Sequence, residues 1–232
     1  MFVHKSESPT IVKRRYVEKY LVTKLLEVYE MNDEPLVESE DDILCSALEE
    51  ILPNVDLVIV ADFGHGLISP RAIELLSMKA PFLAVNTQIN AGNIGYHAIS
   101  RYRRADYICI HEGEIRLDRR SRKGDLKTLV RDLSKRMHCS TVMVTRGKHG
   151  TQVYRDKEGF FECPSLAVRI IDRVGAGDAV LAVTSLCAAA KVPSDVVGFI
   201  GNLAGAQAVG IIGNSASVGR VGLLKSVESL LK

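Results

Sequence analysis

Short apolar runs alternate with amphipathic segments along most of the chain. Nearly all-apolar runs predict strands covered on both faces of a parallel sheet, at 56–61, 82–85, 107–110 and 141–145. Between them, apolar residues recur at helical spacing in 39–51, 69–78 and 126–137. This strand–helix–strand order is typical of α/β proteins with right-handed crossovers. We therefore expect an α/β fold, a mostly parallel sheet with helices on both faces.

Local signals refine these boundaries. Ser39, with Asp42 three residues later, is similar to a capping box and predicts a helix that begins at Ser39. Its expected apolar face consists of Ile43, Leu44, Ala47, Leu48 and Ile51. Ser69 and Pro70 predict the start of the next helix, in which Ile73, Leu76 and Met78 point to the sheet.

The two ends of the chain have other patterns. β-Branched, aromatic and leucine residues predict early strands at 10–16 and 24–29. After Gly150, a charged turn separates two short strands, expected at 151–154 and 159–163. Three helices are then expected, at 177–190, 194–211 and 221–231.

Composition excludes several classes of protein. The 232 residues, with a net charge of +2, are sufficient for one domain, and we expect 1–232 to be one. The five cysteines are scattered without C-x-x-C spacing, which argues against a zinc ribbon or a disulfide framework and suggests the cytoplasm. The first residues lack the apolar core of a signal peptide, and no run approaches the roughly 20 apolar residues of a membrane span.

A basic region lies in the middle of the sequence. It contains Arg101, Arg103, Arg104, Arg116, Arg119, Arg120, Arg122 and Lys123. Acidic residues are interleaved with these cations, and no aromatic platform accompanies them. We therefore interpret the region as solvated surface and expect no nucleic-acid partner.

The segment with most chemical information is IIDRVGAGDAVLAV, at 170–183. Gly175 and Gly177 precede a long small-residue helix, and glycines at such a junction let the backbone approach a ligand. The free N–H groups and the positive end of the helix dipole then form an anion site. A carboxylate there would repel phosphate, so Asp178 is best explained as a general base that takes a proton from a hydroxyl.

Other glycine motifs do not fit. A dinucleotide fingerprint that starts at Gly175 would need a third glycine at the position of Val180, and the chain contains no G-x-x-x-x-G-K-[ST] loop. The plainer alternative is a capped helix after a glycine turn. The nearby histidines, His65, His111 and His149, show no metal-ligand spacing and are interpreted as loop residues.

D-R-V-G-A-G-D-A at 172–179 resembles the C-terminal signature of the PfkB/ribokinase family of carbohydrate kinases. Three other segments resemble family motifs in the expected order: VTRGKHG at 144–150, GNLAGA at 201–206 and IGNSAS at 212–217. Within the family the chain is most similar to the heptose 7-phosphate kinases, through PTIVK at 9–13, EVYE at 27–30 and VADFGHGL at 60–67. The resemblance implies a ribokinase-like fold that uses ATP and Mg²⁺, and K⁺ in some members.

The resemblance also implies roles for individual residues. Asp178 would be the general base, and Gly175, Ala176 and Gly177 would form an anion hole, with the N–H of Asp178 contributing. The nucleotide would be contacted by Thr145, Gly147, Gly150 and Asn202. Glu114 would order Mg²⁺ through water, and Asp172 would lie near a monovalent cation.

The chain departs from the family in several places. Family members begin with a strand that carries a substrate-binding Asp, followed by lid strands and a Gly-Gly motif, and nothing here matches them. The resemblance therefore implies a partial kinase domain. Either the chain is a fragment, or a homodimer or partner chain supplies the missing half, or the chain does not phosphorylate sugars. Histidine replaces asparagine in His111-Glu112-Gly113-Glu114, and His65 stands where the heptose kinases often have lysine.

These observations favour one function and leave two alternatives. The first is phosphoryl transfer from ATP to a hydroxyl of a sugar or sugar phosphate. The second is a nucleotide-binding module, catalytically incomplete without a partner. The third is a kinase for a nucleoside or a vitamin, which would share the site and differ in the acceptor.

Overall fold

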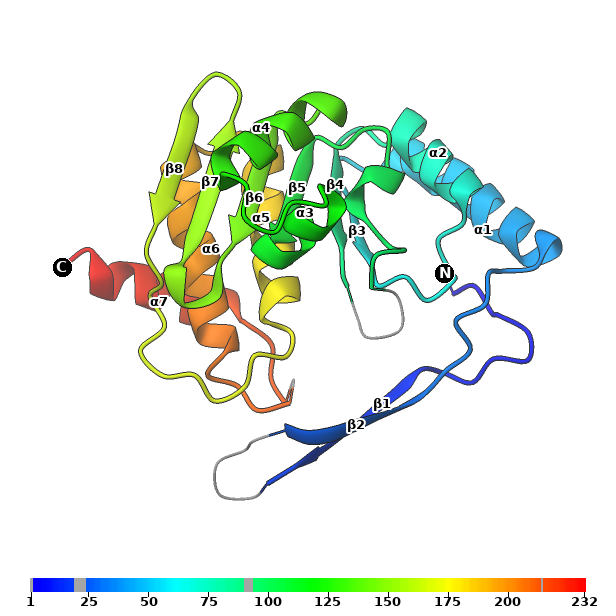
Figure 1. The fold of residues 1–232 in the computed structure, drawn as a ribbon, viewed down its shortest axis with the longest axis horizontal. Helices are drawn as coiled ribbons and strands as arrows, with labels where there is room; N and C mark the ends of the chain where they lie inside the picture. The colour runs from blue at the N-terminus through cyan, green and yellow to red at the C-terminus, as the bar shows by residue number, and fades with distance from the viewer. Residues whose placement is uncertain (1, 19–23, 90–93, 214) are drawn as a thin grey trace.

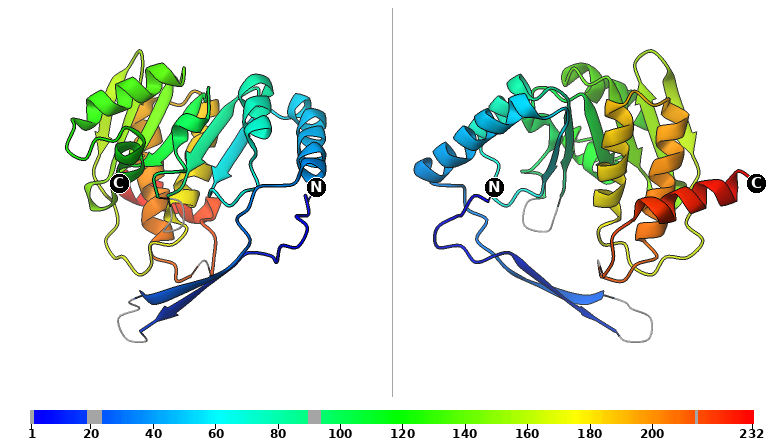
Figure 2. Two further views of the ribbon diagram at one scale, coloured as in Figure 1. Left: turned by 45° about the vertical axis from the view of Figure 1, so that its right-hand side comes forward. Right: turned by 180° about the vertical axis from the view of Figure 1, so that it is seen from behind.

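A computed structural model describes residues 2–18, 24–89, 94–213 and 215–232 of the chain. The molecule consists of an α/β body and a separate two-stranded hairpin that extends beneath it (Figures 1 and 2). The two ends of the chain lie on opposite sides of the body in Figure 1.

The body is built on a six-stranded sheet in which strands follow one another in chain order. The strands are β3 (Val58–Asp62), β4 (Leu83–Thr87), β5 (Tyr107–His111), β6 (Thr141–Thr145), β7 (Thr151–Arg155) and β8 (Gly159–Cys163). β3 to β6 are parallel, whereas β7 and β8 are added as an antiparallel hairpin. The expected mostly parallel sheet is thus confirmed.

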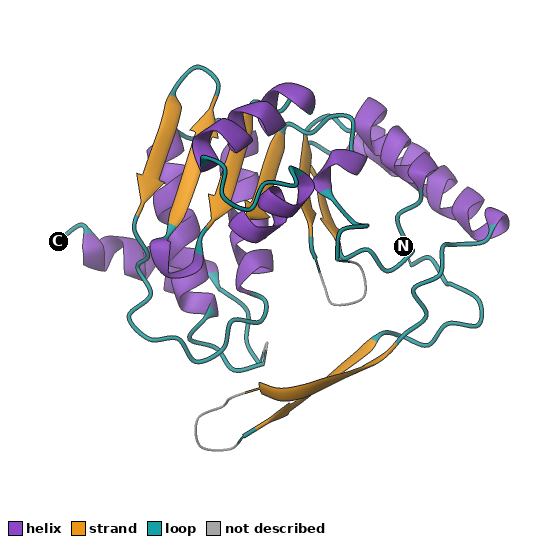
Figure 3. Cartoon of the chain, in the orientation of Figure 1, coloured by secondary structure: helices purple, strands orange, loops and turns teal. Residues whose placement is uncertain are grey.

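Helices cover both faces of this sheet (Figure 3). One face packs against α1 (Glu38–Ile51), α2 (Pro70–Lys79), α3 (Glu112–Asp118) and α4 (Leu126–Arg136). The other face packs against α5 (Ala176–Ala189) and α6 (Ser194–Ala208), and α7 (Arg220–Leu230) packs on α6. Three single-turn 3₁₀ helices lie at Leu52–Asn54, Ile99–Arg101 and Gly147–His149. Nowhere in the described ranges is a helix both long and apolar enough to cross a bilayer.

Alternation along the strands explains why both faces need cover. In β5, Ile108 and Ile110 face the α1–α4 side, while Tyr107 and Cys109 face α5 and α6. All four side chains are at most 2% exposed. The buried Tyr107 hydroxyl lies 2.7 Å from the Thr184 hydroxyl, which fixes α5 against the central strand.

Several local expectations about helices were wrong. The first helix begins at Glu38, because Glu40 accepts a hydrogen bond from the N–H of Val37 and thereby stabilises a start one residue before Ser39. Its apolar face is only partly covered, since Ile43 is 52% and Ile51 44% exposed. Met78 is 74% exposed and points away from the sheet.

Other boundaries differ by a few residues. The last two helices end at Ala208 and Leu230 rather than at 211 and 231, and the third strand is shifted to Val58–Asp62. Helix α3 was not expected at all, because its seven residues are too few to show a period. Ser69 does cap α2, by accepting a hydrogen bond from the N–H of Ala72, and Pro70 takes the first position.

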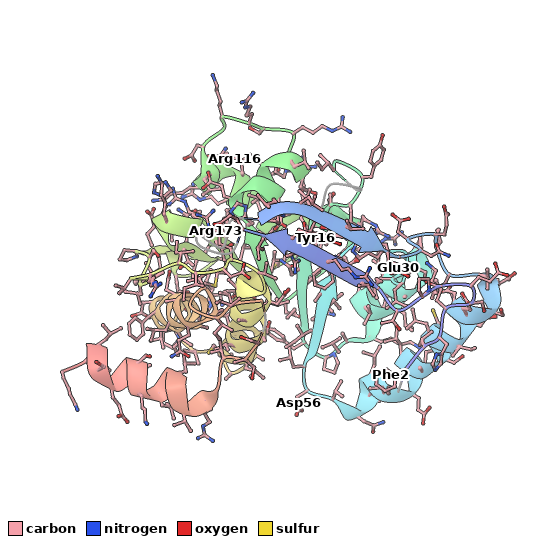
Figure 4. All side chains as sticks on the ribbon, turned by 90° about the horizontal axis from the view of Figure 1, so that it is seen from below. Phe2, Tyr16, Glu30, Asp56, Arg116 and Arg173 are labelled. Atoms are coloured by element: carbon pink, nitrogen blue, oxygen red, sulfur yellow. The ribbon has the colours of Figure 1, made fainter. Side chains whose placement is uncertain are left out.

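The hairpin arm, β1 (Val12–Val17) and β2 (Lys24–Glu30), is the part that stands apart from the main sheet. Its strands pair antiparallel with each other, from Val12 opposite Glu30 to Val17 opposite Lys24. Figure 4 shows the molecule from below, where the arm crosses in front of the body. Tyr16 lies on the arm, and Glu30 lies at the end of β2.

Candidate functional site

Parallel strands bring their carboxyl ends to one edge of a sheet, and this edge holds most of the suspected site. Asp62, Thr87, His111 and Thr145 end the four parallel strands. Helix α5 begins on the same side, and the hairpin arm lies beneath it (Figure 1). In open α/β sheets this edge is where ligands bind.

The turn before α5 leaves backbone donors open. Gly175 has φ +76, a left-handed conformation that glycine adopts without strain, and it starts the helix with no side-chain cap. In the described part of the chain, the N–H groups of Gly177 and Asp178 have no acceptor. A Cβ placed on Gly177 would meet nothing within 4 Å. The helix therefore offers free amides in open space, which can receive an anion.

Asp178 is the third residue of α5, and it lies on an accessible surface rather than in the packed interior. Partial burial raises the pKa of its carboxyl above the ordinary value, while the charge of Lys13 lowers it. A carboxylate beside free amides, open to a ligand and with a raised pKa, can act as a general base.

Glu114 lies in the first turn of α3, which follows β5 directly at the same edge of the sheet. Its carboxylate accepts hydrogen bonds from the N–H of His111, at 2.8 Å, and of Ile89, at 3.2 Å. Burial raises the pKa of Glu114, backbone hydrogen bonds oppose the rise, and the charge of Asp178 adds to it. The two acids are thus near enough to act on each other. His111 itself caps α3 by accepting from the N–H of Gly113.

The turn after β6 contains three of the expected nucleotide residues. Thr145 ends the strand, and Gly147 and Gly150, with φ +55 and +77, form the turn. The N–H of Arg146 donates to the carbonyl of Gly150, at 2.8 Å, which closes the turn. A Cβ on Gly150 would lie 2.0 Å from the carbonyl oxygen of Cys163, so only glycine fits there.

Asn202 and Asp172 take part in packing and in loop contacts. Asn202 is 7% exposed, and its amide donates to the Thr151 hydroxyl at 2.7 Å and to the Gly198 carbonyl at 2.8 Å. Asp172 accepts from the N–H of Val174, at 3.0 Å, and of Gly213, at 2.9 Å. It therefore joins the turn before α5 to the loop after α6. The nucleotide and cation roles of these two residues stay predictions.

Lys13 and His65 meet in the structure, a contact that the sequence did not predict. The Nζ of Lys13, on β1, lies 2.9 Å from the Nε2 of His65, in the loop after β3. His65 was interpreted only as a loop residue, and Lys13 only as part of a similar strand. A basic residue in an alternating strand is an ordinary solvent-facing feature, so the sequence contained no signal for this pair.

The residues present fit a nucleotide's phosphates. Free amides at α5 and a glycine turn after β6 supply donors without bulky side chains. No group of three or more His, Cys, Asp or Glu side chains that could hold a metal occurs among the described residues. A Mg²⁺ ion bound mainly to phosphates needs few protein ligands.

The chain is similar to known proteins in sequence and in fold. The model of the pfkB family carbohydrate kinases matches residues 97–218. The bifunctional protein HldE of Bradyrhizobium diazoefficiens is 25% identical over 206 residues, which are 86% of this chain and 40% of that protein. HldE of Vibrio vulnificus is 27% identical, over 88% of this chain and 41% of that protein. The chain thus spans about 40% of the length of these relatives.

Solved structures show the same fold. Escherichia coli phosphofructokinase-2 in complex with potassium superposes with a TM-score of 0.71 at 15% identity, over 89% of this chain and 67% of that one. Thermotoga maritima ribokinase gives 0.69 at 14% identity, over 95% and 70%. The fold is thus ribokinase-like. With the family match covering more than half of its length, this chain belongs to the pfkB family of carbohydrate kinases.

Proposed function

We propose that this chain provides the nucleotide-binding and catalytic part of a kinase that transfers a phosphoryl group from ATP to a hydroxyl of a sugar or sugar phosphate. The observation that supports it most directly is the placement of Asp178, an accessible carboxylate beside the free amides of α5. Family membership supports the class of reaction, and the similarity to HldE supports an acceptor of the heptose 7-phosphate type.

In the proposed step, the carboxylate of Asp178 takes the proton of the acceptor hydroxyl. The acceptor oxygen forms a bond to the γ-phosphorus while the bond from that phosphorus to the bridging oxygen breaks, and ADP leaves with the electron pair. The turn at Gly175 and the free N–H groups of Gly177 and Asp178 would stabilise the charge on the transferred group. The N–H of Ala176 would join them after leaving the carbonyl of Arg173, to which it donates at 3.4 Å. Because the amides are fixed by the helix, little reorganisation is needed during the transfer.

The remaining residues would hold the nucleotide and its cations. We assign phosphate contacts to Thr145, Gly147 and Gly150, and the adenine end to the helix that contains Asn202. Mg²⁺, when bound, would neutralise charge on the phosphates. Glu114 would hold one of its waters, since both carboxylate oxygens are already fixed by backbone amides.

Asp172 is the proposed residue near a monovalent cation. Its two oxygens already accept amides from the turn before α5 and the loop after α6, so such a cation would lie between these segments. Potassium dependence of the activity, compared with sodium at equal ionic strength, tests this assignment.

Replacement of the base tests the proposed function. Asp178→Asn keeps the shape of the side chain but cannot take the proton, so phosphoryl transfer should fall by about 10²–10⁴-fold. Calorimetric titration with MgATP should show nearly unchanged binding. Asp195→Asn is the matched control, because Asp195 is also in the first turn of a helix, α6, away from the site. Full transfer activity in Asp178→Asn would contradict the role of the base.

A second candidate is a nucleotide-binding module that needs a partner for catalysis. It is favoured by the length of the match, about 40% of the relatives, and by the exposed apolar side chains of Ile43, Ile51 and Ile59. We propose that residues 1–232 form one domain and that a second copy or another chain covers these apolar side chains. MgATP binding without sugar-dependent release of ADP, across a panel of sugars and sugar phosphates, would favour this candidate.

A further inference from the structure

Lys13 and His65 form a hydrogen-bonded pair that joins the hairpin arm to the body. The Nζ of Lys13 lies 2.9 Å from the Nε2 of His65. The ammonium also lies 5.2 Å from the centre of the Tyr29 ring and 5.4 Å from that of Phe63. Tyr29 belongs to the arm and Phe63 to the body, so aromatic rings from both parts hold the cation in place.

The loop that carries His65 is fixed to the body. Asp62, 4% exposed, accepts from the hydroxyl of Tyr102 at 2.8 Å and from the N–H of Gly64 at 3.1 Å. Gly66 has φ +78, and a Cβ there would meet the carbonyl oxygen of Glu34 at 2.0 Å, so the loop is packed tightly against the chain that follows β2. The imidazole is therefore presented by a rigid loop, whereas Lys13 comes from the arm.

The pair is cationic and lacks a carboxylate partner. Among the described residues, neither Lys13 nor His65 forms a salt bridge with an acid. A lysine that donates to an imidazole nitrogen meets its neutral form, so the pair carries one charge and can gain a second on protonation of the ring. Two nitrogens at this distance can both donate to the oxygens of one phosphate.

Burial and neighbouring charges shift the pKa values of both members of the pair. Burial lowers the pKa of Lys13 and Arg15 lowers it further, while Glu27 and Asp178 oppose this. Burial lowers the pKa of His65, Lys13 and His97 add to this, and Asp33 and Asp62 oppose it. The pair also lies at the edge of the sheet where α5 begins, because the loop that carries His65 follows the carboxyl end of β3 (Figure 1).

We propose that Lys13 and His65 form the subsite for an anionic substituent of the acceptor, a phosphate monoester. The inference rests on the proposed function for its acceptor and adds the residues that would recognise the charge. The bound phosphate would bridge the arm and the body. It would replace the direct contact between the two nitrogens and favour uptake of a proton from solvent by His65. A neutral sugar would gain nothing from this pair, so the subsite would select phosphorylated acceptors.

Binding of inorganic phosphate to the 232-residue chain tests the subsite directly. The experiment follows the ring signal of His65 by NMR in saturating MgADP, with calorimetry in parallel. Phosphate should raise the pKa of His65 by about one unit, because a nearby anion favours the charged ring. Lys13→Met and His65→Asn should each weaken phosphate binding by about tenfold, since each removes a charge-assisted hydrogen bond.

Arg14→Met is the matched control, because Arg14 is the next residue of the same strand and its side chain is 64% exposed. It removes the same charge and should leave phosphate affinity unchanged, while Lys13→Arg should retain most of it. An unchanged pKa of His65, or equal losses in Lys13→Met and Arg14→Met, would overturn the subsite and reduce the pair to a contact that holds the arm.

The two proposals fail separately in this design. If the chain binds MgATP but phosphate leaves the pKa of His65 unchanged, the subsite is wrong and the kinase assignment is unaffected. A response of His65 that needs Lys13, in a chain that binds no MgATP, supports the subsite and contradicts the proposed function. Unfolded variants are recognised by circular dichroism, and Lys13→Arg then decides the outcome, because it preserves the charge on the arm.

Discussion

Asp178 is a carboxylate whose protonation should be visible in the rate. Partial burial raises its pKa, and Lys13 lowers it. A base works only when deprotonated, so kcat/KM should fall as the pH decreases through this raised pKa. The acid limb should therefore lie above the value of about 3.9 for a free aspartate.

Lys13→Met should move this limb to higher pH, because it removes the cation that stabilises the charged carboxylate. A profile of kcat/KM against pH for both proteins checks the direction. Arg14→Met should keep the limb in place, and a shift of the limb to lower pH in Lys13→Met would contradict the argument.

Residues in one motif were predictable, and residues that meet across the fold were not. Asp178 and its glycines were identified because G-A-G-D carries its chemistry within a few positions. Lys13 and His65 are separated by 52 positions and become neighbours only when the arm bends back to the loop after β3. Asp62 was quoted only as part of the segment VADFGHGL and given no role, although Tyr102 and His97 contact its carboxylate.

At the scale of the element, the turn after β6 distinguishes two reasons why a position requires glycine, a positive φ and a lack of space for a Cβ. Gly150 has φ +77 and no room for a Cβ, whereas Gly147 has φ +55 and nothing within 4 Å. Gly147→Ala should therefore cost about 1 kcal/mol of the free energy of unfolding, from backbone strain alone. Gly150→Ala adds a collision with the backbone and should cost about 3 kcal/mol or more.

Urea denaturation of both variants gives the comparison. Equal losses of stability would show that the backbone relaxes around the added Cβ of Gly150→Ala, and that its contact with the carbonyl oxygen of Cys163 does not reduce the free energy of unfolding further. MgATP affinity, measured in the same samples, should fall in Gly150→Ala, since displacement of the turn carries Thr145 with it.

Strands and helices of the body were predictable because their apolar periods are long and unbroken. Predicted helix boundaries were wrong where another residue replaced the expected cap. At the start of α1, Glu40 accepts a hydrogen bond from the N–H of Val37, so the helix begins before Ser39. The apolar face of α1 was overestimated because Ile43 and Ile51 have no covering layer in the described structure. The hairpin arm was found as two strands, but its separation from the sheet depends on tertiary contacts that the sequence pattern lacks.

At the scale of the whole molecule, β3 is an edge strand with accessible apolar side chains. It pairs with β4 alone among the described strands, and Ile59 on it is 40% exposed. Unpaired edges with apolar side chains recruit other chains. We therefore expect the chain to self-associate as its concentration rises, and Ile59→Lys to reduce this association.

Sedimentation velocity at increasing concentration measures the effect. Val168→Lys is the control, because Val168 is fully exposed in a loop away from that edge. Equal behaviour of the two variants would show that association, if present, uses another surface.

The exposure of Asp178 also bears on how an ATP-dependent kinase avoids hydrolysing ATP when no acceptor is bound. A base that stands in solvent can deprotonate water as well as an alcohol, and water is always present in excess. Hydrolysis of ATP would then compete with transfer to the acceptor, unless closure of the site around an acceptor expels solvent. If the acceptor itself stabilises that closure, the molecule that receives the phosphoryl group also excludes water from the site of transfer.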